Sequence, residues 1–134
     1  LHEQEDIIGR TKVSGAPLSG GEEFTTPDFN MKGKNGPIIP DDSHMRLMHP
    51  NQNNGVQMLR RGFNYTDGSD GLGLDAGLFF IAFVCDPRTH FIPLLDTMTQ
   101  SDALSEYLKH TGSAVFAVPP GIKDENDFIA SGLF

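Results

Sequence analysis

An unbroken apolar run, Gly77 to Val84, constrains the fold of this chain more than any other feature of its sequence. Its residues favour β-strands, and because both alternating faces are apolar we expect a strand that is buried on both sides. Val56 to Tyr65 is also rich in strand formers and is followed by turn residues, so it supplies an antiparallel partner. The two segments predict a β-hairpin. Its turn residues are Asn64, Asp67, Gly68, Ser69 and Gly71.

Helical patterns lie on both sides of this hairpin. The N-terminal residues carry acidic side chains early and a glycine late, as a short helix ending near Gly9 would. Phe91 to Thr99 and Ser101 to His110 have helical spacing, and Gly112 is expected to end the second helix. Thr11 to Pro40 is rich in Gly, Pro, Ser, Thr and Asn, which predicts a long loop that covers a ligand.

A last strand is predicted at Ser113 to Val118, before Pro119-Pro120-Gly121. The resulting order is helix, loop, strand, strand, helix, strand, which is a ferredoxin-like α+β domain without its first strand. That strand lies inside the sheet, so without it backbone donors and acceptors stay unpaired beside apolar side chains. We therefore expect residues 1–134 to be an incomplete domain that an upstream segment of the same gene product completes.

The composition fits one small domain and narrows the choice of partners. The chain has 134 residues, of which 37% are apolar, and a formal net charge of −8. Nucleic acids and anionic membrane surfaces bind clustered cations, so the acidic balance argues against both as partners. No apolar run reaches the roughly 18 residues that cross a bilayer. Cys85 is the single cysteine, which excludes an internal disulfide, and we expect it to be a buried small hydrophobic residue.

Two motifs carry a family resemblance: Ser43-His44-Met45-Arg46, and Arg60-Arg61-Gly62-Phe63 one strand later. Together they resemble the dye-decolorising haem peroxidases, which have Ser/Ala-His-x-Arg followed by Arg-Arg-Gly-aromatic. The resemblance implies the C-terminal of two ferredoxin-like domains, with an N-terminal domain that carries the distal Asp motif lying upstream. Further matching segments span essentially the whole chain: Gly15 to Leu18, the strand at Gly77, Asp102-Ala103-Leu104 with Tyr107, and Gly112 to Gly121.

The resemblance implies that His44 is the axial ligand of the iron of haem b. A neutral imidazole binds haem iron well, which agrees with that role. Spacing alone would favour a hydrogen-bonded loop histidine instead. His49 has no cysteine partners and lies at the wrong distance from His44 for a helical metal pair, so a zinc site is not expected.

The resemblance also places His49-Pro50-Asn51 at the haem edge, near a propionate. The commoner family sequence there is Asn-Pro-Arg, so this chain lacks a permanent cation that could pair with the propionate carboxylate. Arg46 or the neighbouring loop is the candidate replacement. All of these residues, with His44 and also Arg60, are therefore expected to bind the cofactor.

Arg60 matches the family's distal arginine, which lies on the peroxide side of the haem. A guanidinium is always charged, so it can hold peroxide and assist departure of the leaving oxygen in a dry pocket. Without the motif, an arginine that pairs with a surface acid would be the simpler interpretation. Arg61 points to the opposite side of the strand by the two-residue period, so only one of the two can face the haem.

Asp102 is the candidate for the carboxylate that accepts a hydrogen bond from the other ring nitrogen of the axial histidine. A helix cap is the alternative at this position. Three other acidic residues, Asp96, Asp124 and Asp127, are expected to be solvated. The family's distal acid belongs to a Gly-x-x-Asp-Gly motif that this sequence does not contain. The similar segment from Asp67 to Gly71 is interpreted as the hairpin turn.

The resemblance implies that the parent protein reduces hydrogen peroxide and oxidises small aromatic donors such as phenols and dyes, with the isolated chain inactive. A haem-binding or iron-releasing protein, similar to a deferrochelatase, is the alternative, and a noncatalytic assembly module is a third. A rapid spectral change of bound haem on adding stoichiometric peroxide would favour the enzyme over the carrier. Relatives of this subtype are often exported through a twin-arginine signal, which implies an extracellular or cell-envelope location.

Overall fold

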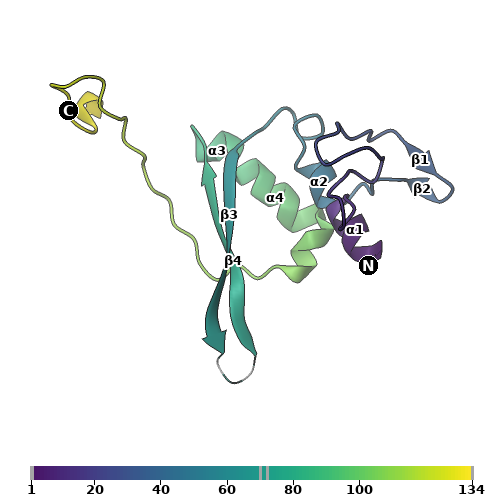
Figure 1. Ribbon diagram of the computed structural model, residues 1–134. Helices are drawn as coiled ribbons and strands as arrows, with labels where there is room; N and C mark the ends of the chain where they lie inside the picture. Colours follow the sequence, from purple (N-terminus) through teal and green to yellow (C-terminus); the bar gives the residue numbers. More distant parts are fainter. Residues whose placement is uncertain (1, 70, 72, 134) are drawn as a thin grey trace.

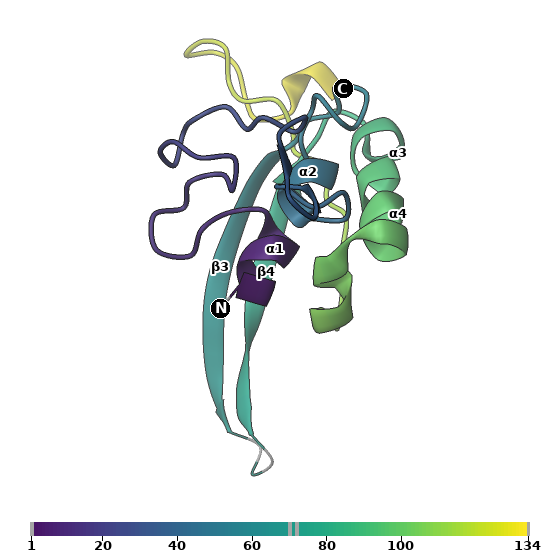
Figure 2. The same ribbon diagram turned by 90° about the vertical axis from the view of Figure 1, so that its right-hand side faces the viewer.

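The computed structural model describes residues 2–69, 71 and 73–133, and it has an α+β fold. Two separate antiparallel sheets of two strands each accompany the helices. Figure 1 shows a body of helices and loops beside a long hairpin, with the C-terminal tail leading away from both. In Figure 2 helices α1 and α2 lie in front of the hairpin, so the two views together place the helical body on one side of it. The predicted fold class is confirmed.

Helix α1 (His2–Ile8) confirms the predicted N-terminal helix. Gly9 follows its last residue, and the φ of Gly9, +85°, is a left-handed conformation that favours glycine. A Cβ atom at Gly9 would lie 3.1 Å from Ser43 Oγ and 3.3 Å from Ile39 Cγ2. The missing side chain therefore lets the end of α1 lie directly against the segment that leads into α2.

The predicted long loop is present, and it contains only the small pair β1 (Lys32–Gly33) and β2 (Gly36–Pro37). Arg10 connects two parts of this loop, since its Nη1 donates to the carbonyls of Gly15 at 2.6 Å and Glu23 at 2.8 Å. Among the described residues, most of the buried apolar side chains belong to this loop. They are Ala16, Pro17, Phe29 and Ile39, and Leu94 of helix α4 is buried as well.

The predicted hairpin is confirmed as β3 (Leu59–Ser69) and β4 (Leu74–Phe83), which pair antiparallel. Its turn lies later than expected, because Asn64 and Asp67 to Ser69 are within β3, with a register irregularity between Thr66 and Ser69. Asp70 lies outside the described residues. The extra residues lengthen the hairpin until it projects beyond the body of the molecule (Figure 1).

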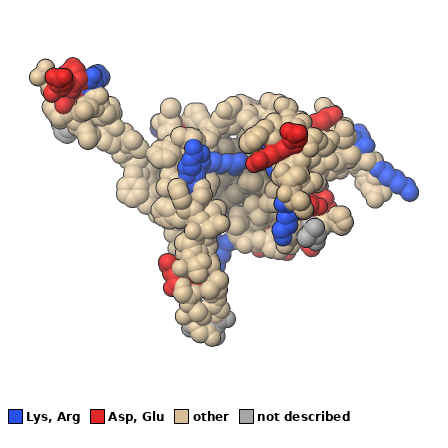
Figure 3. All heavy atoms as spheres, viewed as in Figure 1, with Lys and Arg blue, Asp and Glu red and all other residues tan. Residues whose placement is uncertain are grey.

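The expectation that β4 is buried on both faces was wrong. Phe79 is 62% exposed on one face and Leu78 is 54% exposed on the other. Cys85, just after β4, is exposed as well, which corrects its predicted burial. The physical reason is the same for all three: a two-stranded sheet buries little of either face unless further strands or helices cover it. In Figure 3 most of the projecting surface of the hairpin is uncharged, with acidic side chains on one side of it.

Three helical segments come directly after the hairpin: α3 (Pro87–His90), α4 (Ile92–Ser101) and the 3-10 helix η1 (Ala103–Tyr107). Asp86 caps α3 by accepting from the Arg88 amide at 2.9 Å, and the Arg88 guanidinium beside it lowers the pKa of the Asp86 carboxyl. Helix α4 confirms the prediction over Phe91 to Thr99. The predicted second helix is shorter than expected, since η1 ends at Tyr107 and His110 lies beyond it.

The predicted strand at Ser113 to Val118 is not formed, and residues 108–123 have no regular structure. Val115 and Phe116 are each 83% exposed in this tail. Strand formers need a neighbouring strand to satisfy their backbone groups, and in the described part of the chain none lies beside the tail. A short 3-10 helix, η2 (Ser131–Leu133), lies near its end. No helix within the described ranges combines the length and the apolar character that crossing a bilayer takes.

Candidate functional site

The structure brings His44 and Asp102 into direct contact. His44 is the first residue of α2 (His44–Leu47), and Asp102 links α4 to η1. The Nδ1 atom of His44 lies 2.7 Å from Oδ2 of Asp102, although 58 positions separate the two residues in the chain. The amide of Ala103 also donates to the carbonyl of Asp42 at 3.0 Å, so the backbones of the two segments are joined beside this contact.

Asp102 holds the imidazole and caps η1 at the same time. While Oδ2 faces His44, Oδ1 accepts from the amide of Leu104 at 2.9 Å. The carboxylate side chain is fully buried, and the imidazole is 24% exposed. A buried carboxylate is costly unless donors satisfy it, and here each oxygen has one. The two roles considered for Asp102 in the sequence are therefore both compatible with its geometry.

The contact determines which nitrogen of His44 remains for a ligand. An ionised carboxylate can only accept, so when the ring is neutral its proton lies on Nδ1 and Nε2 keeps its lone pair. Nε2 has no hydrogen bond or ion pair to any described residue. Among those residues no three His, Cys, Asp or Glu side chains form a cluster that could hold a metal ion. This donor set fits a metal that needs one protein nitrogen, as the iron of a porphyrin does.

Two small features position His44 at the start of α2. Ser43 is completely buried, and its hydroxyl donates to the carbonyl of Pro40 at 2.8 Å. The absence of a side chain at Gly9 leaves room for that hydroxyl. The chain therefore enters α2 in one defined orientation, with His44 directed toward Asp102.

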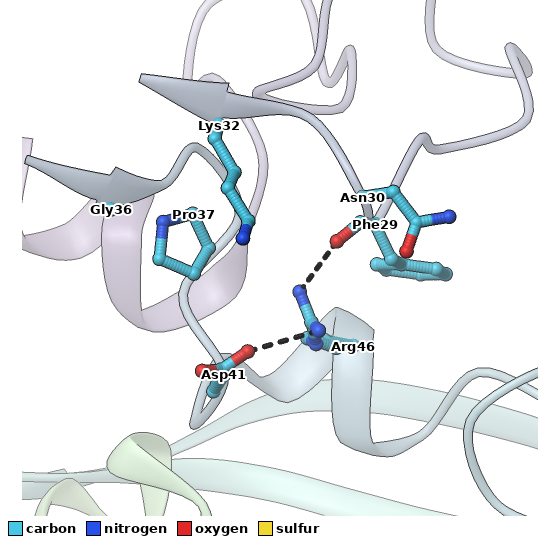
Figure 4. Close-up of a pocket in the computed structure, with 7 residues that line it drawn as sticks. All are labelled: Phe29, Asn30, Lys32, Gly36, Pro37, Asp41 and Arg46. Carbon is cyan, nitrogen blue, oxygen red and sulfur yellow. Dashed lines mark hydrogen bonds and ion pairs between the residues drawn. The ribbon is translucent and has the colours of Figure 1, made fainter. Parts of the chain in front are cut away.

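Arg46 is engaged by the loop that precedes α2. Its Nη1 donates to the carbonyls of Phe29 at 2.9 Å and Ile39 at 3.2 Å, and its Nη2 pairs with Asp41 at 2.9 Å (Figure 4). The guanidinium also lies 5.6 Å from the centre of the Phe29 ring. In this arrangement Arg46 fastens the loop to the helix that carries His44. Its suggested role as a cation for a haem propionate stays a prediction.

The segment predicted to line a haem edge forms a tight turn after α2. The ring of His49 lies edge-on to that of Phe29, with centroids 5.0 Å apart, and its Nδ1 accepts from the amide of Asn51 at 3.2 Å. Pro50 accepts from Gly55 at 2.8 Å through its carbonyl. These contacts fix the turn, and contact with a cofactor stays a prediction for all three residues of the segment.

Asn53 was not singled out from the sequence, but the structure gives it an unusual environment. Both polar atoms of its side chain are buried and have no hydrogen-bond partner among the described residues. It lines a small cavity of about 210 Å³ between the turn after α2 and helix α4. Nothing in the local sequence pattern distinguishes this asparagine from its neighbours Asn51 and Asn54, so it could not have been found in advance.

Arg60 lies on β3 opposite Ala82, and the pairing register puts Leu78, Phe80 and Gly62 on the same face. Leu78 and Phe80 are 54% and 46% exposed. The guanidinium of Arg60 makes no hydrogen bond or ion pair within the described part of the chain. Arg61 points to the other face, as the strand period predicts. No contact joins Arg60 to the His44–Asp102 pair among the residues that the structure describes.

Tyr107 connects η1 to α1, because its hydroxyl donates to Oε1 of Glu3 at 3.4 Å. The negative charges of Glu3 and, to a smaller extent, Glu106 raise the pKa of the Tyr107 phenol. The side chain is therefore a protonated phenol at neutral pH. Its contact with Glu3 links the segment that follows Asp102 to the N-terminal helix.

Known proteins are similar to nearly all of this chain. The family model for the C-terminal part of Dyp-type peroxidases matches residues 1–123. The dye-decolorizing peroxidase of Thermobifida fusca is 43% identical over 120 residues, which cover 87% of this chain and 28% of that protein. The deferrochelatase of Escherichia coli K12 is 38% identical over 136 residues, which cover 99% of this chain and 32% of that protein.

Solved structures agree with these matches. A DyP-type peroxidase from Streptomyces coelicolor superposes with a TM-score of 0.92 at 41% identity, covering 99% of this chain and 37% of that one. An oxyferrous complex of DtpA from Streptomyces lividans has a TM-score of 0.90 at 41% identity, over 98% and 37% of the two chains. This chain thus spans about a third of the length of its relatives. It belongs to the Dyp-type peroxidase family, and it corresponds to the family's C-terminal part.

Proposed function

We propose that this chain holds haem b through His44 and forms the axial-ligand side of a peroxidase site. The observation that carries the proposal is the 2.7 Å contact between Nδ1 of His44 and the buried carboxylate of Asp102, which leaves Nε2 as the ligand atom. When bound, haem supplies the redox chemistry of peroxide reduction, and the protein supplies the axial ligand, the polarity and the access.

Asp102 is proposed to position His44 and to tune it. A carboxylate that accepts the Nδ1 proton fixes the tautomer and the ring orientation, and it raises the basicity of Nε2. The amide of Leu104 at 2.9 Å fixes the carboxylate in turn. Asp102 therefore acts through His44, and it need not contact the reacting atoms itself.

Arg60 is proposed to face the peroxide side of the haem. Its guanidinium is permanently charged and is not engaged by any described residue, so it can donate to a ligand. Leu78 and Phe80 on the same face are apolar and exposed, which suits the flat apolar surface of a porphyrin. A cation among apolar neighbours can hold peroxide and stabilise the charge that develops on the departing oxygen.

The site is proposed to be completed by an upstream segment of the same gene product. Apolar side chains on both faces of the hairpin are exposed, and the tail that contains Val115 and Phe116 has no strand beside it. Burying such surfaces is a large favourable contribution to folding. We call this chain together with that segment the completed protein. It is expected to reduce hydrogen peroxide and to oxidise small aromatic donors such as phenols and dyes.

A thermal melt tests this completion. The isolated chain should unfold without a sharp cooperative transition and should bind a hydrophobic dye, because its hairpin faces are open to solvent. The completed protein should unfold cooperatively and bind little dye. Circular dichroism at a fixed heating rate measures the first property, and dye fluorescence measures the second. A cooperative transition of the isolated chain as a monomer would exclude the proposed upstream segment as a requirement for folding.

Replacing Asp102 by Asn in the completed protein tests the positioning role. The amide keeps an acceptor for Leu104 but is a poor acceptor for the Nδ1 proton, so the imidazole loses its carboxylate partner. We expect peroxide to react about 10- to 100-fold more slowly. The midpoint potential of the haem should rise, because a less basic imidazole stabilises ferric iron less. Asp96→Asn, on the exposed side of α4, is the matched control. If both variants kept the wild-type potential, Asp102 would have no positioning role.

An iron-releasing protein is the second candidate function. Similarity to the Escherichia coli deferrochelatase over 99% of this chain favours it. Stopped-flow mixing of the completed protein with stoichiometric peroxide separates the two functions. A fast change of the haem spectrum followed by oxidation of a phenol supports the peroxidase. Release of iron from haem, with no such spectral change, supports the second candidate.

A further inference from the structure

A second cavity lies beside α2, on the side of the β1–β2 hairpin (Figure 4). Its volume is about 560 Å³, which is within the range of roughly 300–1,000 Å³ for small-molecule sites. It is distinct from the His44–Asp102 contact, because neither of those residues lines it. We propose that it binds a single-ring aromatic carboxylate that serves as a reducing substrate. The lining residues are Phe29, Asn30, Lys32, Gly36, Pro37, Asp41 and Arg46.

The charges in this cavity favour one anionic group. The side chain of Lys32 extends from β1 into the space, and its ammonium has no hydrogen bond or ion pair among the described residues. The other cation, Arg46, is already paired with Asp41 at 2.9 Å. One positive charge is therefore left uncompensated. Figure 3 shows basic side chains projecting at the β1–β2 end, although the whole chain has a net charge of −8.

The rest of the lining suits an aromatic ring with a polar substituent. Pro37 presents an exposed apolar surface next to Lys32, so a ring attached to a bound carboxylate would lie against it. Asn30, beside Phe29 on the other side of the cavity, carries an amide that can donate and accept. A phenolic acid could therefore pair its carboxylate with the Lys32 ammonium and form a hydrogen bond between its phenol and the Asn30 amide.

The location relates the cavity to the proposed function, on which this inference rests. Arg46 forms part of the cavity wall, and it belongs to the same short helix, α2, as His44. A donor bound here would therefore lie against the helix that carries the proposed axial ligand. With haem bound, each phenolic acid would give up one electron to it and one proton to solvent, and would leave as a phenoxyl radical. Two such donors supply the two electrons and two protons that convert one hydrogen peroxide into two waters.

Charge reversal at Lys32 in the haem-loaded completed protein tests the site. Steady-state oxidation of ferulate, which carries a carboxylate, is compared with that of guaiacol, a similar phenol without one. In Lys32→Glu the KM for ferulate should rise about tenfold, because an attraction is replaced by a repulsion. The KM for guaiacol should change little. Lys34→Glu is the matched control, since Lys34 lies in the turn between β1 and β2 and does not line the cavity.

A binding measurement keeps the inference separate from the proposed function. Titration of ferulate into the resting, haem-loaded protein, followed by NMR line broadening, should show weaker binding in Lys32→Glu and in Lys32→Gln. Ferulate binding to Lys34→Glu should be as strong as binding to the wild-type protein. Equal weakening by Lys32→Glu and Lys34→Glu would indicate general attraction of anions, and ferulate binding that no variant changes would exclude the site. Loss of peroxide turnover with both donors in the wild-type protein would contradict the proposed function, while the titration would still decide about the cavity.

Discussion

Replacing His44 by alanine is expected to remove almost all haem from the completed protein. Haem iron is proposed to make its one bond to a protein side chain through Nε2 of this residue, and alanine offers no ligand atom. The substitution also leaves Oδ2 of the fully buried Asp102 carboxylate without its donor at 2.7 Å. The ratio of haem absorbance in the Soret region to protein absorbance, after purification with excess haem, measures the occupancy.

A second histidine serves as the control for this result. His90 in α3 contacts Thr89 and the carbonyl of Asp86 through its ring, and it makes no hydrogen bond or ion pair to a carboxylate of the described residues. His90→Ala should therefore bind as much haem as the wild-type protein. Unchanged occupancy in His44→Ala would exclude His44 as the axial ligand. Asp102→Ala distinguishes loss of the ligand from general destabilisation, because it disturbs the same buried contact but keeps the imidazole.

Arg60→Ala should leave haem bound and slow its reaction with peroxide by about 10²–10³-fold. A preorganised donor directed at developing negative charge has effects of this size when it is removed. The rate is measured by stopped-flow absorbance, as the change of the haem spectrum over a series of peroxide concentrations. The slope of the observed rate against concentration gives the second-order constant.

Arg61→Ala is the matched control for Arg60, since the two residues are adjacent and point to opposite faces of β3. Both substitutions remove one positive charge at nearly the same place, so a general electrostatic effect would be shared. We expect the Arg61 variant to react with peroxide at close to the wild-type rate. Equal slowing by both substitutions, or slowing by Arg61→Ala alone, would mean that Arg60 is not the residue that holds peroxide.

Local patterns predicted the elements that depend mainly on nearby residues. Helix α1 ends just before Gly9 and α4 follows Phe91, as their capping and spacing indicate. The hairpin was also foreseen, although its turn was placed too early because Asn64 and Asp67 are turn formers that here lie within a strand. A turn is decided by the register of both strands, and a sequence pattern on one strand contains only half of that information.

Predictions that depend on distant partners were less successful. Ser113 to Val118 has the composition of a strand, but a strand forms only beside another strand, and none accompanies it in the described residues. The exposure of β4 and Cys85 has the same cause. Apolar composition predicts which side chains would lower the free energy of the protein when they are buried. It does not predict the surface that buries them, because that surface comes from elsewhere in the fold or in the protein.

The residues of the candidate site were found through motifs rather than through spacing. His44 and Asp102 are 58 positions apart, and no periodicity relates them. The engagement of Arg46 by Phe29, Ile39 and Asp41 was not predicted, because irregular loops leave no pattern of contacts in the sequence. The cavity beside Lys32 was missed for the same reason.

Resonance Raman spectroscopy of the ferrous completed protein tests the central claim most directly. With natural histidine and with ¹⁵N-labelled histidine, the stretching band between the iron and its axial ligand should differ in frequency, because the bond proposed here joins iron to Nε2 of His44. The shift should be present in the wild-type protein and in His90→Ala, and the band should be lost in His44→Ala. A band whose frequency is the same with natural and with ¹⁵N-labelled histidine, or a band that persists in His44→Ala, would contradict the account.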